Sequence, residues 1–497
     1  MFIGIDLGTS SIKTILINEN QKIIGNASIS LNLSNPQSGF YEQEPDSWFT
    51  ATLKCFEKLR SDFPKEYKAT QSIGISGQMH GATLIDKNNS VLRPCILWND
   101  TRSTSQCVEM EKNFPLFREQ SGNIAMPGFT APKILWVQKH EPDIFKQIHK
   151  VLLPKDYLRF KLTGSYYTDM SDASGTLWLD VKKRKWSEDL LNLTNLNLEH
   201  MPKLVEGSDP TDNLSLQLKE ELSFDNNIII AGGAGDQAAG AIGSGVIDSH
   251  QSMISLGTSG VYFSPTSKFS SNTNQAVHSF CHCLPDTWHH MSVMLSATNC
   301  LNWIAHLYGL ETIDAINKAK TFFNKNFNPN STPFFLPYLS GERTPHNNPY
   351  LRGSFHMLTT STSIDSMLYA VIEGISFGIK DGFEAVHSVS SKSEDIYIIG
   401  GGSKSFFWAD LIASVLDQRI IVGEDSDLGP AVGVARLAML ATKKYKKSDV
   451  VKNMQIVREC FPSNKLSDQL QNRYLVWKEI VSVNKPIAKT IMDTEYE

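Results

Sequence analysis

Two short glycine turns have the residue types that hold phosphate groups. The sequence LGTS occurs at residues 7–10 and again at residues 256–259, each time between two runs of strand-forming residues. Glycine lets the backbone approach an oxyanion closely, and successive N–H groups then form an anion-binding nest, to which Thr9 and Thr258 add hydroxyl donors. Two ordinary hairpin turns with polar residues would have the same sequence. On the turns alone, both interpretations stay open.

Two aspartates are candidates for the chemistry itself. Asp6 directly precedes the first turn, where a carboxylate would repel phosphate unless it holds Mg2+, usually through water; the second turn has Ser255 at the matching position. Asp236 follows a strand and begins a helix, and the glycines before it leave room for a ligand around its carboxylate. We expect the helix N-terminus to orient Asp236 and to lower its pKa. A simple helix cap is the alternative.

Three further segments carry surfaces that suit small ligands. The loop at residues 78–80 (QMH) lies between two glycines and two predicted strands, so it could hydrogen-bond a polyol, or its histidine could be satisfied within the turn. Residues 98–102 (WNDTR) combine an aromatic face with donors and acceptors, or form a helix cap with an Asp100–Arg102 pair. The glycines at residues 400–402 could admit a nucleotide against bare backbone, or simply turn the chain.

Composition and motifs exclude several classes of protein. A net charge of -5, from 47 Lys+Arg against 52 Asp+Glu, argues against a nucleic-acid scaffold and against a polybasic membrane binder. The pattern of a P-loop nucleotide-binding protein does not occur. Residues 233–238 (GAGDQA) fit the glycine pattern of a dinucleotide fold, but the acidic residue that should follow about twenty positions later is missing. The run Cys281-His282-Cys283 lacks a second pair of zinc-finger spacing.

The seven cysteines bear on the compartment. They are odd in number and scattered, so no disulfide framework is predicted and a reducing cytoplasm is expected. The chain opens without a signal-peptide pattern and has no stretch of 18 apolar residues. We therefore expect a cytoplasmic protein that binds neither nucleic acid nor a membrane.

The elements that must position these residues repeat along the chain. The first thirty residues read as three antiparallel strands, and residues 252–263 begin a similar strand–turn–strand unit about half the chain further on. Two such β-rich lobes predict a layered α/β architecture with a cleft between them. We expect an N-terminal domain over residues 1–246, a C-terminal domain over 247–482 and a loose polar tail over 483–497.

Together these motifs resemble a known family. GIDLGTSS, SLGTSG and IIGGGSKS are similar to the phosphate and adenosine motifs of the actin–hexokinase–heat-shock ATPase superfamily, whose lobes have a duplicated ribonuclease-H-like fold. Within it, GFTAPKILWVQKH and EGISFGIKDG resemble the two signatures of the FGGY carbohydrate kinases. GQMHGATLID, RPCILWNDTR, VLLPKDYLR, SDASGTLWLD and FLPYLSGERTPHNNP are closest to bacterial xylulokinases, and the resemblance runs to about residue 440.

The resemblance implies roles for matching residues. Asp236 would be the general base and Asp6 would organise Mg2+, while Met79 and His80 would contact the sugar together with Asp236. Phosphates of ATP would lie on the two turns, and adenosine would lie beyond the late glycines; the residues concerned are Gly8, Thr9, Gly257, Thr258, Gly401, Gly402 and Ser405. Gln237 and Ser405 depart from the family, where many or some relatives have Asn.

The implied reaction is ATP-dependent phosphorylation of D-xylulose, a ketopentose, to D-xylulose 5-phosphate, in xylose catabolism. The transition state of phosphoryl transfer is loose, so the protein mainly positions groups and stabilises charge. Another FGGY kinase, for L-ribulose, gluconate or a related polyol, is the first alternative. A regulatory ATPase that transfers phosphate to no acceptor is the second. The family also implies a possible homodimer.

Overall fold

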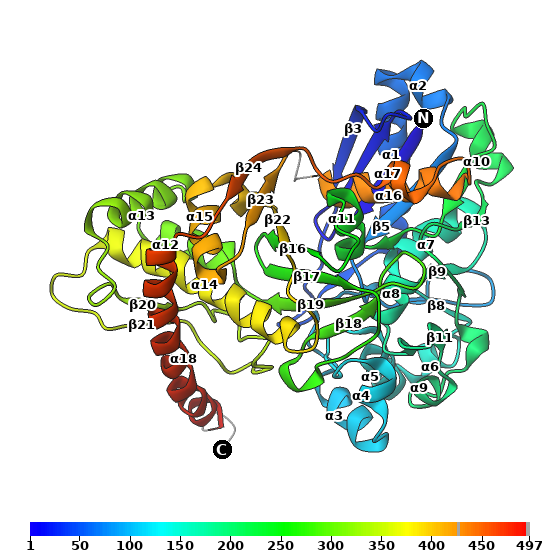
Figure 1. The fold of residues 1–497 in the computed structure, drawn as a ribbon. Helices are drawn as coiled ribbons and strands as arrows, with labels where there is room; N and C mark the ends of the chain where they lie inside the picture. Colours follow the sequence, from blue (N-terminus) through cyan, green and yellow to red (C-terminus); the bar gives the residue numbers. More distant parts are fainter. Residues whose placement is uncertain (425–427, 494–497) are drawn as a thin grey trace.

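The computed structural model describes residues 1–424 and 428–493, and it shows two lobes, each built on a seven-stranded sheet (Figure 1). The first sheet has the strand order β13–β14–β5–β1–β2–β3, with β15 beside β5. Consecutive strands β1, β2 and β3 pair antiparallel, as the first thirty residues predict. The strands are β1 (Phe2–Leu7), β2 (Ser11–Ile17), β3 (Ile23–Ser30), β5 (Ser72–Gly77), β13 (Pro210–Asn213), β14 (Ile229–Ala231) and β15 (Ala234–Gly235).

The second sheet repeats the pairing scheme of the first. β1 pairs antiparallel with β2 and parallel with β5, while β16 pairs antiparallel with β17 and parallel with β22. Outside each parallel neighbour lie one more parallel strand and then an antiparallel one. The predicted duplicated α/β architecture is therefore confirmed. The strands are β16 (Gln251–Leu256), β17 (Gly260–Thr266), β18 (His278–Cys281), β19 (Trp288–Met294), β22 (Asp395–Ile399), β23 (Ile420–Gly423) and β24 (Ile456–Cys460).

Amphipathic helices complete both lobes. Trp48, Cys55 and Leu59 recur at helical spacing on one side of the first long helix, and they are fully buried in the core of the first sheet. Helices of the second half share one large apolar core with the second sheet. The helices used below are α1 (Pro45–Asp62), α5 (Thr130–His140), α7 (Pro154–Thr163), α8 (Met170–Ser174), α12 (Thr298–Leu307), α13 (Thr312–Asn326), α14 (Ile364–His387) and α15 (Phe406–Leu416).

Two helices cross between the lobes with their backbones in contact. A Cβ atom on Gly243 of α11 (Asp236–Ser244) would lie 2.0 Å from the carbonyl oxygen of Gly429, at the start of α16 (Gly429–Ala441). A Cβ on Gly433 of α16 would lie 1.8 Å from the carbonyl oxygen of Ala239. Distances below 3.0 Å exclude any side chain at these positions, so glycine is what permits the close crossing.

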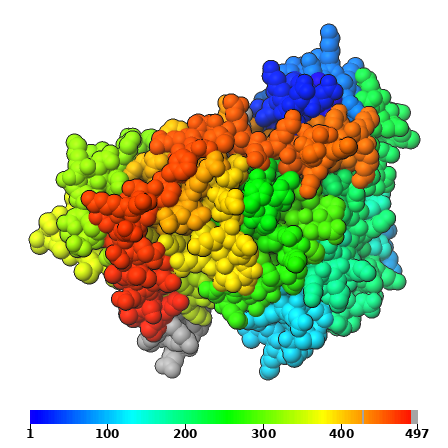
Figure 2. Space-filling view, in the orientation of Figure 1, coloured from blue at the N-terminus to red at the C-terminus, as the bar shows by residue number. Residues whose placement is uncertain are grey.

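Helix α16 belongs to the second half of the sequence but lies on the first sheet. Cβ atoms on Gly4 of β1 and Gly74 of β5 would meet the carbonyl oxygens of Ala431 and Val434 at 2.0 and 1.9 Å. Figure 2 shows the orange segment that contains α16 against the blue N-terminal strands. The predicted division of the sequence at residues 246/247 therefore differs from the division of the lobes in space.

The C-terminal segment differs from the loose tail that its polar sequence suggested. Helix α18 spans Asn464–Asp493, so residues 483–493 are helical. Its first half is anchored because Tyr474 and Trp477 are buried in the core of the second lobe. The helix continues from this anchor along the outside of the lobe (Figure 1).

Among residues 1–424 and 428–493, no helix combines the length and the apolar character needed to cross a bilayer.

Candidate active site

A cavity of about 370 Å3 lies where the two sheets face each other. The first half of the chain contributes Asp6, Lys13 and Asp236, and the second half contributes Ser255 and Gly400. Asp6 and Ser255 are the matching residues next to the two LGTS turns. Equivalent strand ends of the two sheets therefore meet at one cavity. This arrangement agrees with the predicted cleft between the lobes.

The two turns are closed by their own backbone hydrogen bonds. The amide of Gly8 donates to the carbonyl of Ser11 at 3.0 Å, and that of Gly257 donates to Ser259 at 3.1 Å. These two N–H groups therefore have partners within the turn. Binding of phosphate would fall to the amides and hydroxyls that follow each glycine, with Thr258 in the second turn.

Asp6 has an environment that disfavours its charge. Burial raises the pKa of Asp6 to about 6, although Lys13 and the nearby Ser76 hydroxyl act in the opposite direction. The shift means that the carboxylate has lost much of its hydration. A cation in the cavity would replace that hydration.

Asp236 is the first residue of α11, with Gly235 as the residue before the helix. Burial, followed by repulsion from Asp6, raises the pKa of Asp236 to about 7. The expected lowering by the helix N-terminus is therefore wrong in direction, because loss of hydration outweighs the hydrogen bond from the Gln237 amide at 2.7 Å. Gly235 occupies the N-cap position and Asp236 is the first helical residue, so Asp236 is not the N-cap residue that the simple alternative requires.

Met79 lies beside Asp236. Its sulfur is 2.9 Å from the position of a Cβ on Gly235, the residue before the aspartate, and its side chain is 7% exposed. The absence of a side chain on Gly235 is what makes room for Met79. The fold therefore brings the loop after β5 directly against the start of α11.

His80 follows in the same loop with a left-handed backbone, φ 71°. Its Nδ1 is 2.9 Å from the carbonyl oxygen of Gly175. Burial, with a smaller effect of Lys133, lowers the pKa of His80 to about 3, so the ring is neutral near pH 7. A carbonyl only accepts, so Nδ1 carries the proton and Nε2 presents a lone pair. The local bond satisfies one nitrogen only, and the other is available to a hydroxyl donor.

Thr9 joins the first turn to the loop at residues 78–80. Its hydroxyl donates to Oε1 of Gln78 at 3.1 Å and accepts from Nε1 of Trp98 at 3.0 Å. Gln43 completes this network, since its amide donates to the Thr9 carbonyl at 2.7 Å and its Oε1 accepts from Gln78 at 2.9 Å. Sequence reasoning missed Gln43, because no local pattern marks a glutamine in a strand of two residues, β4 (Glu42–Gln43).

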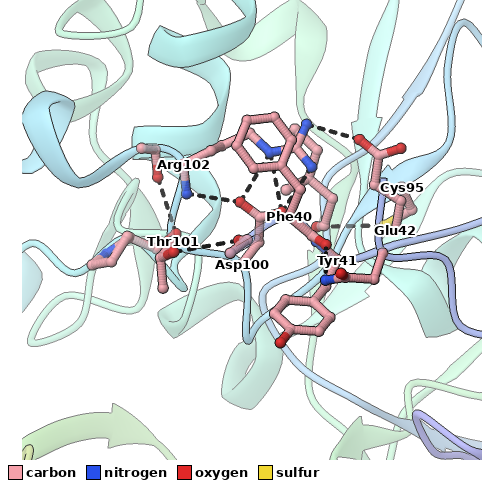
Figure 3. Close-up of polar contacts among 12 residues, drawn as sticks. Phe40, Tyr41, Glu42, Cys95, Asp100, Thr101 and Arg102 are labelled. Atoms are coloured by element: carbon pink, nitrogen blue, oxygen red, sulfur yellow. Dashed lines mark hydrogen bonds and ion pairs between the residues drawn. The ribbon is translucent and has the colours of Figure 1, made fainter. Parts of the chain in front are cut away.

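The Asp100–Arg102 pair has a structural role (Figure 3). Both side chains are buried, and the Asp100 carboxylate also accepts from the amide of Tyr41 at 2.7 Å. The Arg102 guanidinium lies 3.9 Å from the ring centre of Phe40 and pairs with Glu42 at 2.7 Å. This pair anchors the segment that carries Trp98, so within residues 98–102 the link to the site runs through Trp98.

The glycines after β22 have unequal surroundings. Gly400 lines the cavity and has φ 89°, and a Cβ on Gly402 would lie 2.5 Å from the side chain of Leu256. Gly401 has open space at its Cβ position. The hydroxyl of Ser405 caps α15 by accepting from the amide of Trp408 at 3.3 Å. Of these predicted adenosine residues, only Gly401 therefore presents open backbone.

A buried ionic cluster holds the loop before Asp236, and sequence reasoning gave it no role. Lys155 pairs with Asp156 at 2.6 Å and with Asp169 at 2.9 Å, with all three side chains fully buried. Asp169 accepts from Ser171 at 2.5 Å, and Ser171 in turn accepts from the amide of Gly235 at 3.1 Å. VLLPKDYLR carries Lys155 and Asp156, SDASG carries Ser171, and Asp169 lies two residues before it, but only the fold reveals their contact.

Comparison with known proteins gives consistent matches over both halves. A model of the N-terminal domain of the FGGY family of carbohydrate kinases matches residues 1–243, and a model of the C-terminal domain matches residues 252–442. A xylulose kinase of Escherichia coli (strain K12) is 46% identical over 446 residues, which are 90% of this chain and 91% of the relative.

Two solved structures extend the comparison to the fold. The crystal structure of a xyloylose kinase from Brucella ovis has a TM-score of 0.93 and 42% sequence identity, over 97% of this chain and 99% of the other. A gluconate kinase from Lactobacillus acidophilus has a TM-score of 0.90 and 25% identity, over 97% of both chains.

Proposed function

The chain belongs to the FGGY family of carbohydrate kinases, and from this premise we propose that it transfers the γ-phosphoryl group of ATP to the terminal hydroxyl of D-xylulose, giving D-xylulose 5-phosphate. The observation that carries the proposal is the meeting of Asp236, Met79 and Asp6 beside one cavity lined by both halves. Relatives that are xylulose kinases support D-xylulose as the sugar. A role in xylose catabolism would follow.

Asp236 acts as the general base in this proposal. Its carboxylate lies in the cavity next to the loop that holds Met79, and its raised pKa of about 7 is close to a neutral working pH. The base orients the 5-hydroxyl toward the γ-phosphorus and accepts its proton late, as the new O–P bond forms. Gln237 follows on the next helical position and leaves the carboxylate free to face the cavity.

His80 and Met79 bind the sugar. The Nε2 lone pair of neutral His80 accepts a hydrogen bond from a sugar hydroxyl, and the side chain of Met79 packs against the carbon chain. The two residues lie in one loop directly against the start of α11. They therefore fix the distance between the sugar and Asp236.

Asp6 organises Mg2+ in this proposal. A carboxylate beside a cavity with room for several waters fits this ion, because Mg2+ takes oxygen ligands and keeps part of its water. The raised pKa of Asp6 marks a carboxylate that a divalent cation would stabilise. When bound, Mg2+ neutralises charge on the β- and γ-phosphates.

The remaining predicted residues hold the nucleotide. Gly8 and Gly257 shape the two turns. The amide of Thr9 in the first turn, and the amide and hydroxyl of Thr258 in the second, face the phosphates. Adenosine lies along Gly401, with Gly402 and Ser405 as the supports of that loop. Closing of the lobes around both substrates would exclude water and limit hydrolysis of ATP.

Release of ADP from Mg-ATP tests the proposal, measured alone and with D-xylulose, L-ribulose, D-ribulose, D-gluconate or glycerol. We expect strong stimulation by D-xylulose. Preference for D-gluconate would favour the second candidate, which the gluconate kinase fold neighbour supports. Steady ADP release without stimulation by any sugar would contradict a sugar kinase and favour a regulatory ATPase.

A further inference from the structure

Arg343 is an arginine of the second lobe without a carboxylate partner in the described part of the chain. It lies in the segment between β20 (Phe334–Leu336) and β21 (Ser354–His356), and burial lowers its pKa. Its neighbour Glu342 accepts from the backbone amides of Leu295 and of Arg343 itself, at 2.9 and 2.7 Å. The Glu342 carboxylate is thus hydrogen-bonded to backbone amides, so the Arg343 guanidinium is available to other partners.

The Arg343 guanidinium lies against residues that lead, contact by contact, to His80. Nη1 is 3.5 Å from Nε2 of His278, whose Nδ1 is 3.4 Å from the amide oxygen of Asn123. The amide oxygen only accepts, so His278 carries its proton on Nδ1 and accepts from Arg343. Nη2 lies 4.0 Å from the Cβ position of Gly128, a residue without a side chain.

Aromatic contacts connect Arg343 to the sugar loop. The ring of Phe129 is edge-on to His278 at 5.4 Å and edge-on to His80 at 4.6 Å between ring centres. His80 and Met79 then lead to Gly235 and to the base Asp236. Arg343 and Asp236 thus stand at the two ends of one chain of contacts, with the sugar-binding loop between them.

The Nε and Nη2 groups of Arg343 are donors without a partner in the described part of the chain. Only Nη1 has a hydrogen-bond contact in the described structure, and neither Nε nor Nη2 is among the sealed polar atoms that lack a partner. The residue is half-buried. A guanidinium that has lost much of its hydration and keeps free N–H groups is suited to an oxygen-rich ligand.

We propose that Arg343 is a specificity-determining residue that donates hydrogen bonds to the C1 hydroxyl and the C2 ketone oxygen of the sugar. This rests on the proposed function, which places the C5 hydroxyl at Asp236. The ketone end then lies at the other end of this chain of contacts, beside Arg343. Two adjacent oxygens match the fork of a guanidinium. Because the arginine comes from the second lobe and His80 from the first, the sugar itself links the lobes.

The test compares Arg343→Met and Arg343→Lys with the wild type. We expect Arg343→Met to lower kcat/KM for D-xylulose roughly 10- to 100-fold, mainly through the sugar KM, as for loss of hydrogen bonds from a charged group. The KM for ATP should change far less. Arg343→Lys should keep part of the affinity, because it retains the charge but not the fork. Calorimetric titration with D-xylulose, without nucleotide, measures the same loss in binding.

A matched control is available in the same segment. Arg352 is exposed and donates only to the backbone carbonyls of Pro349 and Leu351, both at 2.8 Å, so Arg352→Met should leave the sugar KM unchanged. Xylitol, in which the ketone is reduced, gives a second comparison: the preference for D-xylulose over xylitol should shrink in Arg343→Met.

The outcomes separate this inference from the proposed function. An unchanged sugar KM and an unchanged preference in a folded Arg343→Met variant would overturn the role of Arg343, with the wild type still a D-xylulose kinase. A wild type that prefers another sugar would overturn the proposed function. Loss of that sugar's binding in Arg343→Met would then still place Arg343 in the sugar site but would overturn its assignment to a ketone.

Discussion

At the scale of single residues, Asp236 should control turnover. Asp236→Asn keeps the shape of the side chain but removes the base, so we expect kcat to fall by roughly a hundredfold or more while ATP still binds. Steady-state rates and a separate nucleotide titration measure the two effects. Near-normal kcat in the variant would exclude Asp236 as the base.

The raised pKa of Asp236 also predicts a pH dependence. The carboxyl is protonated below about pH 7 and works as a base only when ionised, so kcat/KM should rise as pH increases through about 7. Higher Mg2+ should move this rise to lower pH, because a nearby cation stabilises the carboxylate. Profiles at two Mg2+ concentrations measure the shift, and a rise that ignores Mg2+ would contradict the metal assignment of Asp6.

His80 should affect the sugar and not the nucleotide. His80→Ala removes the acceptor at Nε2, so the KM for D-xylulose should rise more than the KM for ATP, by roughly tenfold if one hydrogen bond is lost. Asn195→Ala serves as a control that is neutral for the sugar KM, because Asn195 is exposed and its side chain donates only a 3.2 Å hydrogen bond to Gln138 in the described residues. An unchanged sugar KM in His80→Ala would remove the residue from the site.

Residue types alone predicted two acids that line the cavity between the lobes, Asp6 and Asp236, because each stands beside a glycine turn at the end of a strand. Their catalytic roles stay predictions. Gln43 and Arg343 had no sequence signal, because each makes its contacts with residues distant in sequence. The pKa of Asp236 was expected in the wrong direction, since burial depends on packing from both lobes.

At the scale of elements, the crossing of α11 and α16 gives a matched pair of substitutions. Gly243→Ala would place a methyl group 2.0 Å from a backbone carbonyl that cannot move aside, so we expect a loss of stability of about 1–3 kcal/mol. Gly240→Ala, one turn earlier, meets only side-chain atoms at 3.9 Å and should be neutral or slightly stabilising. Denaturant unfolding measures both, and equal effects would contradict the close crossing.

Strands with a regular alternating pattern were predicted correctly, since the first thirty residues form the antiparallel strands β1, β2 and β3. The position of α16 was not, because periodicity shows which face of a helix is buried but not which sheet buries it. The end of α18 was missed for a related reason. Its polar sequence gives no signal, and helicity there continues from residues packed further back.

At the scale of the whole molecule, the packing of α16 on the first sheet predicts that the halves depend on each other. A fragment of residues 1–246 would expose the faces of β1 and β5 that Ala431 and Val434 cover, so we expect it to aggregate when produced alone. Coexpression with residues 247–497 should restore soluble protein. A soluble, cooperatively unfolding first fragment would show that α16 is dispensable to the first lobe.

The repeated pairing scheme has a consequence for the direction of transfer. The QMH loop follows β5 and the GGG loop follows β22, which are equivalent strands, so on the proposed assignment acceptor and donor are held by twin positions facing each other. Such a symmetric frame does not by itself determine which half holds the phosphoryl donor and which holds the acceptor. The symmetry is broken by two substitutions, Asp6 opposite Ser255 and Asp236 opposite Gly429, which leave both acids in one half. On the proposed assignment, this asymmetry gives the repeated frame a direction, because the base and the metal site both belong to the half that holds the acceptor.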